Sequence, residues 1–215
     1  ISYNEYMKSI NIHCTTQQFS NDLSTPMAAY LKINTPNSFL LESVEQGEKI
    51  GRYSIIGYDP LITVQGYETY ISIFTDNNKS IYDGNPFDQL NKLYSAINVN
   101  QQGHSPIKNG FFGYFSWESM ACIETVPIKT NESCLFELQI PRKLIVFDHV
   151  MQQLFITISG ATNDYKTELN EVLETLNKQL NNRSYQMVSV PKSLNWDHVE
   201  SNMTKQEYLD AVNKV

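Results

Sequence analysis

The sequence predicts an α+β protein built on antiparallel sheets, and two observations carry this prediction. Short β-type runs follow one another between turn residues, at a spacing typical of antiparallel strands. Helical patterns are also present, but they do not alternate regularly with the strands, which disfavours a doubly wound parallel sheet. The expected order is helix, several strands, helix, strand, β-hairpin and helix.

The elements of the first half begin with a short helix. Thr25 and Pro26 open it and it runs through Ile33, because proline is favoured at the first helical position. Asn85 and Pro86 cap a second helix that extends to Ile97. Between the two helices, strands are expected over residues 38–44, 53–56, 61–64 and 69–74.

The second half contains the clearest β-hairpin and the clearest helix. Two alternating runs flank Met151, which predicts paired strands over residues 143–150 and 154–159. Leu169, Val172 and Leu176 recur at helical spacing within a helix expected over residues 164–180. The remaining expectations are a loop over 101–109, an aromatic strand over 110–116 and a helix over 117–124.

The end of the chain suggests a domain boundary. Residues after 181 are polar and aperiodic, whereas Thr204 and Glu207 form the pattern of a capping box ahead of an amphipathic helix. We therefore expect a first domain over residues 1–181, a linker over 182–203 and the first helix of a truncated second domain over 204–215. An ordinary frayed C-terminal helix is the alternative.

Composition excludes several classes of partner. The net charge of −7 disfavours nucleic acid and anionic membranes, which need a basic surface. The sequence has neither a signal-peptide pattern at its start nor an apolar run of about 20 residues that would span a membrane. Three widely spaced cysteines predict reduced thiols rather than a disulfide framework. These features favour a soluble, cytoplasmic protein.

No self-contained catalytic set is evident in the sequence. The four histidines are scattered, without the spacing of metal ligands. The segment 47–54 departs from the phosphate-loop pattern, because Lys49 precedes its second glycine. Asp148 and His149 end the first strand of the hairpin, and a structural histidine in a turn is the favoured interpretation.

Four stretches resemble a known family. Residues 39–60 contain Leu-Leu-Glu-Ser, a glycine turn and Gly-Arg-Tyr-Ser followed by Asp-Pro, and they closely resemble the N-terminal signature of anthranilate synthase component I. Residues 110–115 are similar to the Gly-aromatic-Gly-Tyr strand of that family, and residues 144–150 to its Asp-His hairpin. Residues 204–212 resemble the opening of its chorismate-binding domain.

The resemblance implies a fold, an activity and partners. The fold would be orthogonally packed antiparallel sheets covered by outer helices. The parent enzyme, a lyase, would convert chorismate to anthranilate and pyruvate with ammonia from a glutamine amidotransferase subunit. Chorismate, Mg²⁺ and the catalytic carboxylates would belong to the following domain, so no catalytic or metal-binding residue is expected in this chain and the chain alone would be inactive. Aminodeoxychorismate synthase component I and a free-standing amino-acid-binding module are the alternatives.

The resemblance also implies that the Leu-Leu-Glu-Ser strand helps to bind L-tryptophan as a feedback inhibitor. The candidate residues are Leu41, Glu42, Ser43, Arg52, Tyr53 and Ser54. On a strand, Leu41 and Ser43 share one face and Glu42 lies on the other, and Leu41 with Tyr53 would line an apolar slot for the indole. Structural roles are the alternatives: an ion pair of Glu42 with Arg52 or Lys49, and a core position for Ser43.

Overall fold

The computed structural model describes residues 9–21, 24–42, 51–76, 78–124, 133–160, 165–178 and 203–213. The chain divides into two compact units, Ile1–Leu180 and Asn181–Val215. In the described parts, no helix combines the length and the apolar character needed to cross a membrane. Ser43 and Lys49, which the sequence singled out, lie outside the described residues.

The elements of the first unit are mainly strands, with helices near the start, in the middle and near the end. In chain order they are β1 (Ile10–Ser20), α1 (Pro26–Ile33), β2 (Phe39–Glu42), β3 (Tyr53–Tyr67), β4 (Tyr70–Thr75), β5 (Asn78–Asp83), α2 (Pro86–Ala96), β6 (Ile97–Gln102), β7 (Phe112–Phe115), the 3-10 helix η1 (Trp117–Cys122), β8 (Phe136–Asp148), β9 (Gln153–Gly160) and α3 (Tyr165–Asn177). The second unit contains α4 (Lys205–Val212).

The described strands form one continuous sheet in the order β5-β4-β3-β8-β9-β1-β6, with β2 also paired to β3 and β7 to β8. Its pairs are antiparallel except for β1 with β6, which is parallel. The α+β class predicted from the sequence is therefore observed. The expectation of antiparallel sheets is corrected at one pair, because α2 connects β5 to β6, which runs parallel to β1.

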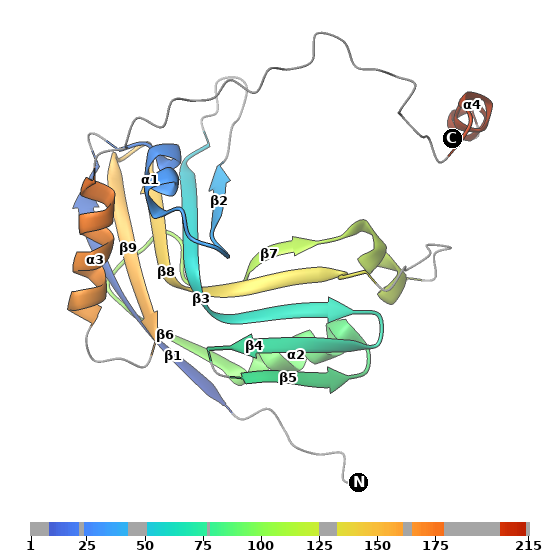
Figure 1. Cartoon of the computed structure of the whole chain (residues 1–215), viewed down its shortest axis with the longest axis horizontal. Helices are drawn as coiled ribbons and strands as arrows, with labels where there is room; N and C mark the ends of the chain where they lie inside the picture. Colours follow the sequence, from blue (N-terminus) through green and yellow to red (C-terminus); the bar gives the residue numbers. More distant parts are fainter. Residues whose placement is uncertain are drawn as a thin grey trace. The chain divides into compact units, whose positions relative to one another are not determined.

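The long strands β3 and β8 bend together and divide the sheet into two halves. The register between them shifts at Pro60 to Ile62, and Asp59 has a positive φ of 54°. Proline interrupts a ladder of hydrogen bonds and is tolerated in a strand at bulges such as this one. In Figure 1 both strands change direction here, so that the half with β9 and β1 runs up the picture and the half with β4 and β5 runs across it. The sequence expectation of two separate strands on either side of Pro60 was wrong.

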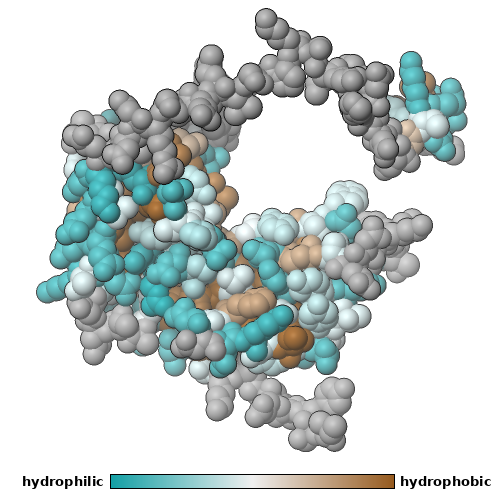
Figure 2. Space-filling view, in the orientation of Figure 1, coloured by the Kyte–Doolittle hydropathy of each residue, from teal (hydrophilic) through white to brown (hydrophobic). Residues whose placement is uncertain are grey.

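Helices α1 and α3 cover one face of the half of the sheet that contains β9 and β1 (Figure 1). Ile56, Ile145 and Ile156 on that face are fully buried and pack in one cluster with Ala29 of α1 and Val172 of α3. The outward side of α3 is hydrophilic, as the teal surface at the left of Figure 2 shows. The amphipathic pattern predicted for this helix is thus confirmed.

Other local predictions had mixed outcomes. The cap and start of α1 and α2 are confirmed, and Thr204 and Glu207 form the predicted capping box of α4. Strands β1, β5 and β6 were not predicted from the sequence, and part of the expected loop at 101–109 belongs to β6. The helix expected over 117–124 is a 3-10 helix.

Candidate functional site

The candidate site begins with the pairing of β2 and β3. Leu41 lies opposite Ile55, and Glu42 lies opposite Ser54. Side chains directly opposite one another in antiparallel strands share a face of the sheet. Leu41 and Ile55 therefore lie on one face, and Glu42 and Ser54 lie on the other.

The face that carries Leu41 is apolar and aromatic. Phe39, Tyr53 and Ile55 pack there against buried Leu144, Val146 and Phe155. The ring of Phe39 stacks on that of Phe112 in β7, with centroids 5.3 Å apart. Leu41 itself remains 45% exposed. Leu41 is thus an apolar side chain that stays open to solvent beside a packed aromatic cluster.

Arg52 forms the strongest polar contact of the site, with the buried carboxylate of Asp148. The guanidinium donates from Nε and Nη2 to this carboxylate, with the Nη2–Oδ2 distance at 2.9 Å. Backbone N–H groups of Val150 and Met151 also donate to Asp148 Oδ1. Burial alone would raise the pKa of Asp148, but the hydrogen bonds from Arg52 and from the two backbone N–H groups hold it below its usual value.

This contact corrects one interpretation of the sequence. Arg52 pairs with Asp148 rather than with Glu42, and Glu42 has no ion pair among the residues that the structure describes. The side chain of Arg52 is half exposed. Since a guanidinium has five N–H groups, Arg52 retains donors that an anionic group can reach.

The turn between β8 and β9 holds the start of β3 by further contacts. Ser54 Oγ lies 2.7 Å from Nε2 of His149, and the backbone N–H of His149 donates to the carbonyl of Arg52. Arg52 also lies over the ring of Tyr53, 5.0 Å from its centroid. Residues 52–54 are therefore fixed by the hairpin turn as well as by strand pairing.

The six residues predicted from the sequence do not all converge. Leu41 and Tyr53 share the apolar face, where Arg52 lies over the Tyr53 ring. Glu42 and Ser54 lie on the opposite face, and the buried Ser54 is already bonded to His149. Ser43 lies outside the described residues.

The structural role that the sequence favoured for His149 agrees with its contacts to Ser54 and to the carbonyl of Arg52. The ion pair of Asp148 with Arg52 was not predicted. The available signal was the Asp-His pair at the end of a predicted strand. What the sequence did not supply was the pairing of β3 with β8, which places Tyr53 opposite Asp148.

A metal-binding site was sought among the described residues and is not present there. Across the ranges that the structure describes, no group of three or more His, Cys, Asp or Glu side chains is placed to hold a metal ion. We therefore assign no metal ligand to these residues.

Comparisons with known proteins show sequence similarity to one family of enzymes. A family model described as chorismate binding enzyme matches residues 36–215. Anthranilate synthase component 1 of Acetivibrio thermocellus is 28% identical over 96% of this chain and 45% of its own length. The Synechocystis protein of the same name is 31% identical over 75% of this chain and 34% of its own length. The chain thus spans less than half the length of these curated relatives.

Among solved structures, that of anthranilate synthase component I from Streptococcus pneumoniae is similar. It is 22% identical, with a TM-score of 0.49, over 75% of this chain and 36% of that one.

Proposed function

This chain belongs to the chorismate-binding enzyme family, and from that premise we propose that it is the N-terminal, regulatory and scaffolding part of an anthranilate synthase component I. The observation that carries the proposal is the match to relatives of that name along nearly the whole chain. The complete protein would convert chorismate and ammonia to anthranilate and pyruvate. A glutamine amidotransferase subunit would supply the ammonia.

The catalytic chemistry is proposed to reside outside this chain. The chain spans less than half the length of its curated relatives, and we assign chorismate binding, Mg²⁺ and the catalytic carboxylates to the remainder of the protein. The chain alone is expected to be inactive. Its two half-sheets, which share β3 and β8, are our candidates for the orthogonally packed layers that the family resemblance implies.

We further propose that the apolar face beside Leu41 contributes to a feedback site for L-tryptophan. Leu41 and Tyr53 would contact the indole, and the exposed N–H groups of Arg52 would bind the carboxylate of the inhibitor. Ser43 follows β2 directly and is proposed to contact the ligand as well. Because binding is linked, tryptophan would weaken chorismate binding by the same factor that chorismate weakens tryptophan binding.

The complete protein tests this function directly. Purified full-length protein should form fluorescent anthranilate from chorismate and ammonium chloride, and L-tryptophan should inhibit the reaction while L-phenylalanine should not. Formation of aminodeoxychorismate instead would assign the protein to the folate branch. Formation of neither product would favour an amino-acid-binding module without catalysis.

The observation that favours the tryptophan branch over the folate branch is the name of the relatives, together with Glu-Ser followed by Gly-Arg-Tyr-Ser in this sequence. A cytoplasmic location is part of the same proposal, and the lack of a spanning helix in the described residues is compatible with it.

A further inference from the structure

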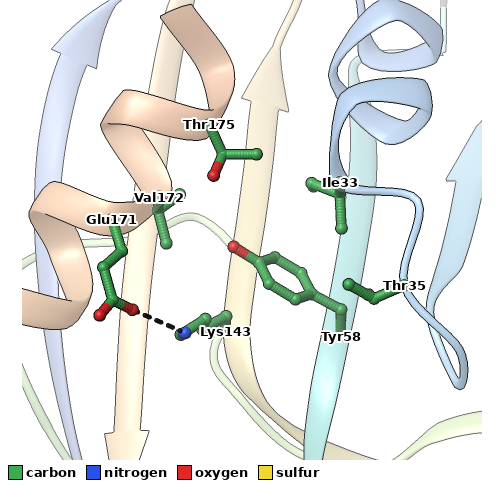
Figure 3. A pocket seen from close by; sticks show the side chains of 7 residues that line it. All are labelled: Ile33, Thr35, Tyr58, Lys143, Glu171, Val172 and Thr175. Atoms are coloured by element: carbon green, nitrogen blue, oxygen red, sulfur yellow. Dashed lines mark hydrogen bonds and ion pairs between the residues drawn. The ribbon is translucent and has the colours of Figure 1, made fainter. Parts of the chain in front are cut away.

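Two features of the first unit lie outside the proposed tryptophan site. One is a cavity of about 120 Å³ beneath α1 and α3, where Lys143 donates to Glu171 (Figure 3). Its mixed polar and apolar lining selects no particular class of ligand. The other feature is the free edge of β5, and the sequence of this strand is complementary to itself.

Strand β5 lies at one end of the strand order, and among the residues that the structure describes only β4 pairs with it. Figure 1 shows it at the lower border of the half of the sheet that contains β4. Every side chain of β5 except that of Tyr82 is exposed, and the apolar side chain of Ile81 is 56% exposed. An open edge of this kind is a template for pairing with another strand.

Alternate residues of β5 direct their backbone groups away from β4. The N–H of Gly84 donates to the carbonyl of Thr69 at 2.7 Å, so Gly84 faces β4. In an antiparallel pair, residues that bond to the neighbouring strand alternate with residues whose N–H and C=O groups point away from it. The outward groups of β5 therefore belong to Lys79, Ile81 and Asp83.

The same three residues share one face of the sheet, because side chains two positions apart in a strand point the same way. A cationic side chain, Lys79, and an anionic one, Asp83, thus flank the apolar Ile81. Neither charge has an ion-pair partner among the described residues. Lys79 Nζ lies 5.2 Å from the centroid of the Phe74 ring, which keeps this charge on the same face as that ring.

The charges select one register for a second, antiparallel copy of β5. When Ile81 lies opposite Ile81 of the second copy, Lys79 lies opposite Asp83, and Asp83 lies opposite Lys79. A shift of two residues in either direction keeps outward groups paired but places Ile81 opposite a charged side chain. The register with its two-fold axis at Ile81 is therefore the one that pairs apolar with apolar surface and unlike charges with each other.

We propose that the protein forms a two-fold symmetric dimer in which the two copies of β5 pair antiparallel, so that one sheet runs through both copies. The N–H of Ile81 donates to the carbonyl of Ile81 in the second copy, and the N–H of Asp83 donates to the carbonyl of Lys79. Symmetry provides each of these bonds twice. They leave in place the bond of 2.7 Å from Gln89 to the carbonyl of Asp83. This inference rests on β5 and not on the proposed enzymatic function.

The test is sedimentation equilibrium of the full-length protein, purified without other subunits. A contact between two edge strands is smaller than the roughly 1,200–2,000 Å² of stable interfaces, so we expect a monomer–dimer equilibrium with a Kd on the order of 50 µM. Ile81→Lys places like charges at the axis and should raise this Kd at least tenfold. Val99→Lys is the matched control, because Val99 is an exposed aliphatic residue of β6, at the other end of the strand order, and it should leave the Kd unchanged.

Exchange of the two charges distinguishes this interface from other modes of self-association. Lys79→Asp and Asp83→Lys should each weaken the dimer at least tenfold, because each places like charges opposite one another. The variant with both changes restores unlike pairs and should recover the native affinity. All the substituted side chains of β5 are exposed, so the variants should fold, which circular dichroism checks. A protein that stays monomeric, or a dimer whose Kd does not respond to these changes, would overturn the proposal.

Discussion

Ser54 Oγ lies 2.7 Å from Nε2 of His149, although 95 residues separate the two in the sequence. Beside them, Arg52 and Asp148 form an ion pair at 2.9 Å. These contacts join the start of β3 to the turn between β8 and β9. The candidate ligand face beside Leu41 and Tyr53 is thereby supported from a distant part of the chain.

Replacement of Asp148 by Asn should destabilise the first unit. The amide keeps the size of the carboxylate but loses a charged acceptor of four N–H groups, and hydrogen bonds to charged groups contribute about 1.5–3 kcal/mol. Urea unfolding followed by circular dichroism measures the change. Asp76→Asn, which removes an exposed partner of Arg142, is the control and should cost less than about 1 kcal/mol. Equal losses in the two variants would contradict a special role for Asp148.

The pH dependence of stability should carry the signature of Asp148. Its pKa is lowered in the folded protein, so its contribution is fully present above the unfolded value of about 3.9 and is lost as the pH falls through the folded value. The difference in unfolding free energy between the native sequence and Asp148→Asn should therefore be constant from about pH 5 to 7 and shrink below about pH 4. If the difference in unfolding free energy instead grew as the pH fell, the predicted contribution of the Asp148 carboxylate would be contradicted.

Gly113→Ala should weaken the pairing of β7 with β8. A Cβ at this position would collide with the backbone carbonyl of Glu137 on the neighbouring strand. Overpacking of this kind costs about 1–3 kcal/mol, and hydrogen exchange should show reduced protection in β7. Gly110→Ala is the matched control, because a Cβ there meets nothing within 4 Å. Similar exchange in both variants would contradict the prediction, because it would show that β7 accommodates the added methyl group without weaker pairing to β8.

Ser43→Phe in the full-length protein should relieve inhibition by L-tryptophan while uninhibited anthranilate formation is retained. The bulky ring would occupy space that the proposed site needs for the ligand. Inhibition curves at fixed chorismate concentration measure the effect, and an increase of at least tenfold in the half-inhibitory concentration is expected. If activity falls in parallel with inhibition, Ser43 supports the fold rather than the inhibitor.

Helix starts were predictable because their determinants are local. Thr25 accepts from the backbone N–H of Ala28, and Asn85 accepts from those of Phe87 and Asp88, as cap positions should. Strands with polar sequences were not predictable in the same way. β6 reads Ile-Asn-Val-Asn-Gln-Gln, and backbone pairing with β1 rather than an apolar pattern makes it a strand.

The candidate site was predictable only in part, for a related reason. The Leu-Leu-Glu-Ser and Gly-Arg-Tyr-Ser segments are close in sequence, so their pairing across a turn follows from local patterns, and the structure pairs Glu42 with Ser54. The ion pair of Arg52, in contrast, joins residues that lie far apart in the sequence. Nothing near Arg52 in the sequence specifies Asp148, which becomes its neighbour only when β8 pairs with β3.

The separation of β3 and β8 in the sequence determines how long β3 must wait for its partner strand during synthesis on the ribosome. β3 ends at Tyr67 and β8 begins at Phe136, so a ribosome adds about 70 residues between them. At roughly 5–20 residues per second, this takes about 4–14 s. β2 and β4 can already pair with one edge of β3 in that interval, but the edge reserved for β8 stays open on the nascent chain. A chaperone that shields exposed strand edges would have its clearest target there.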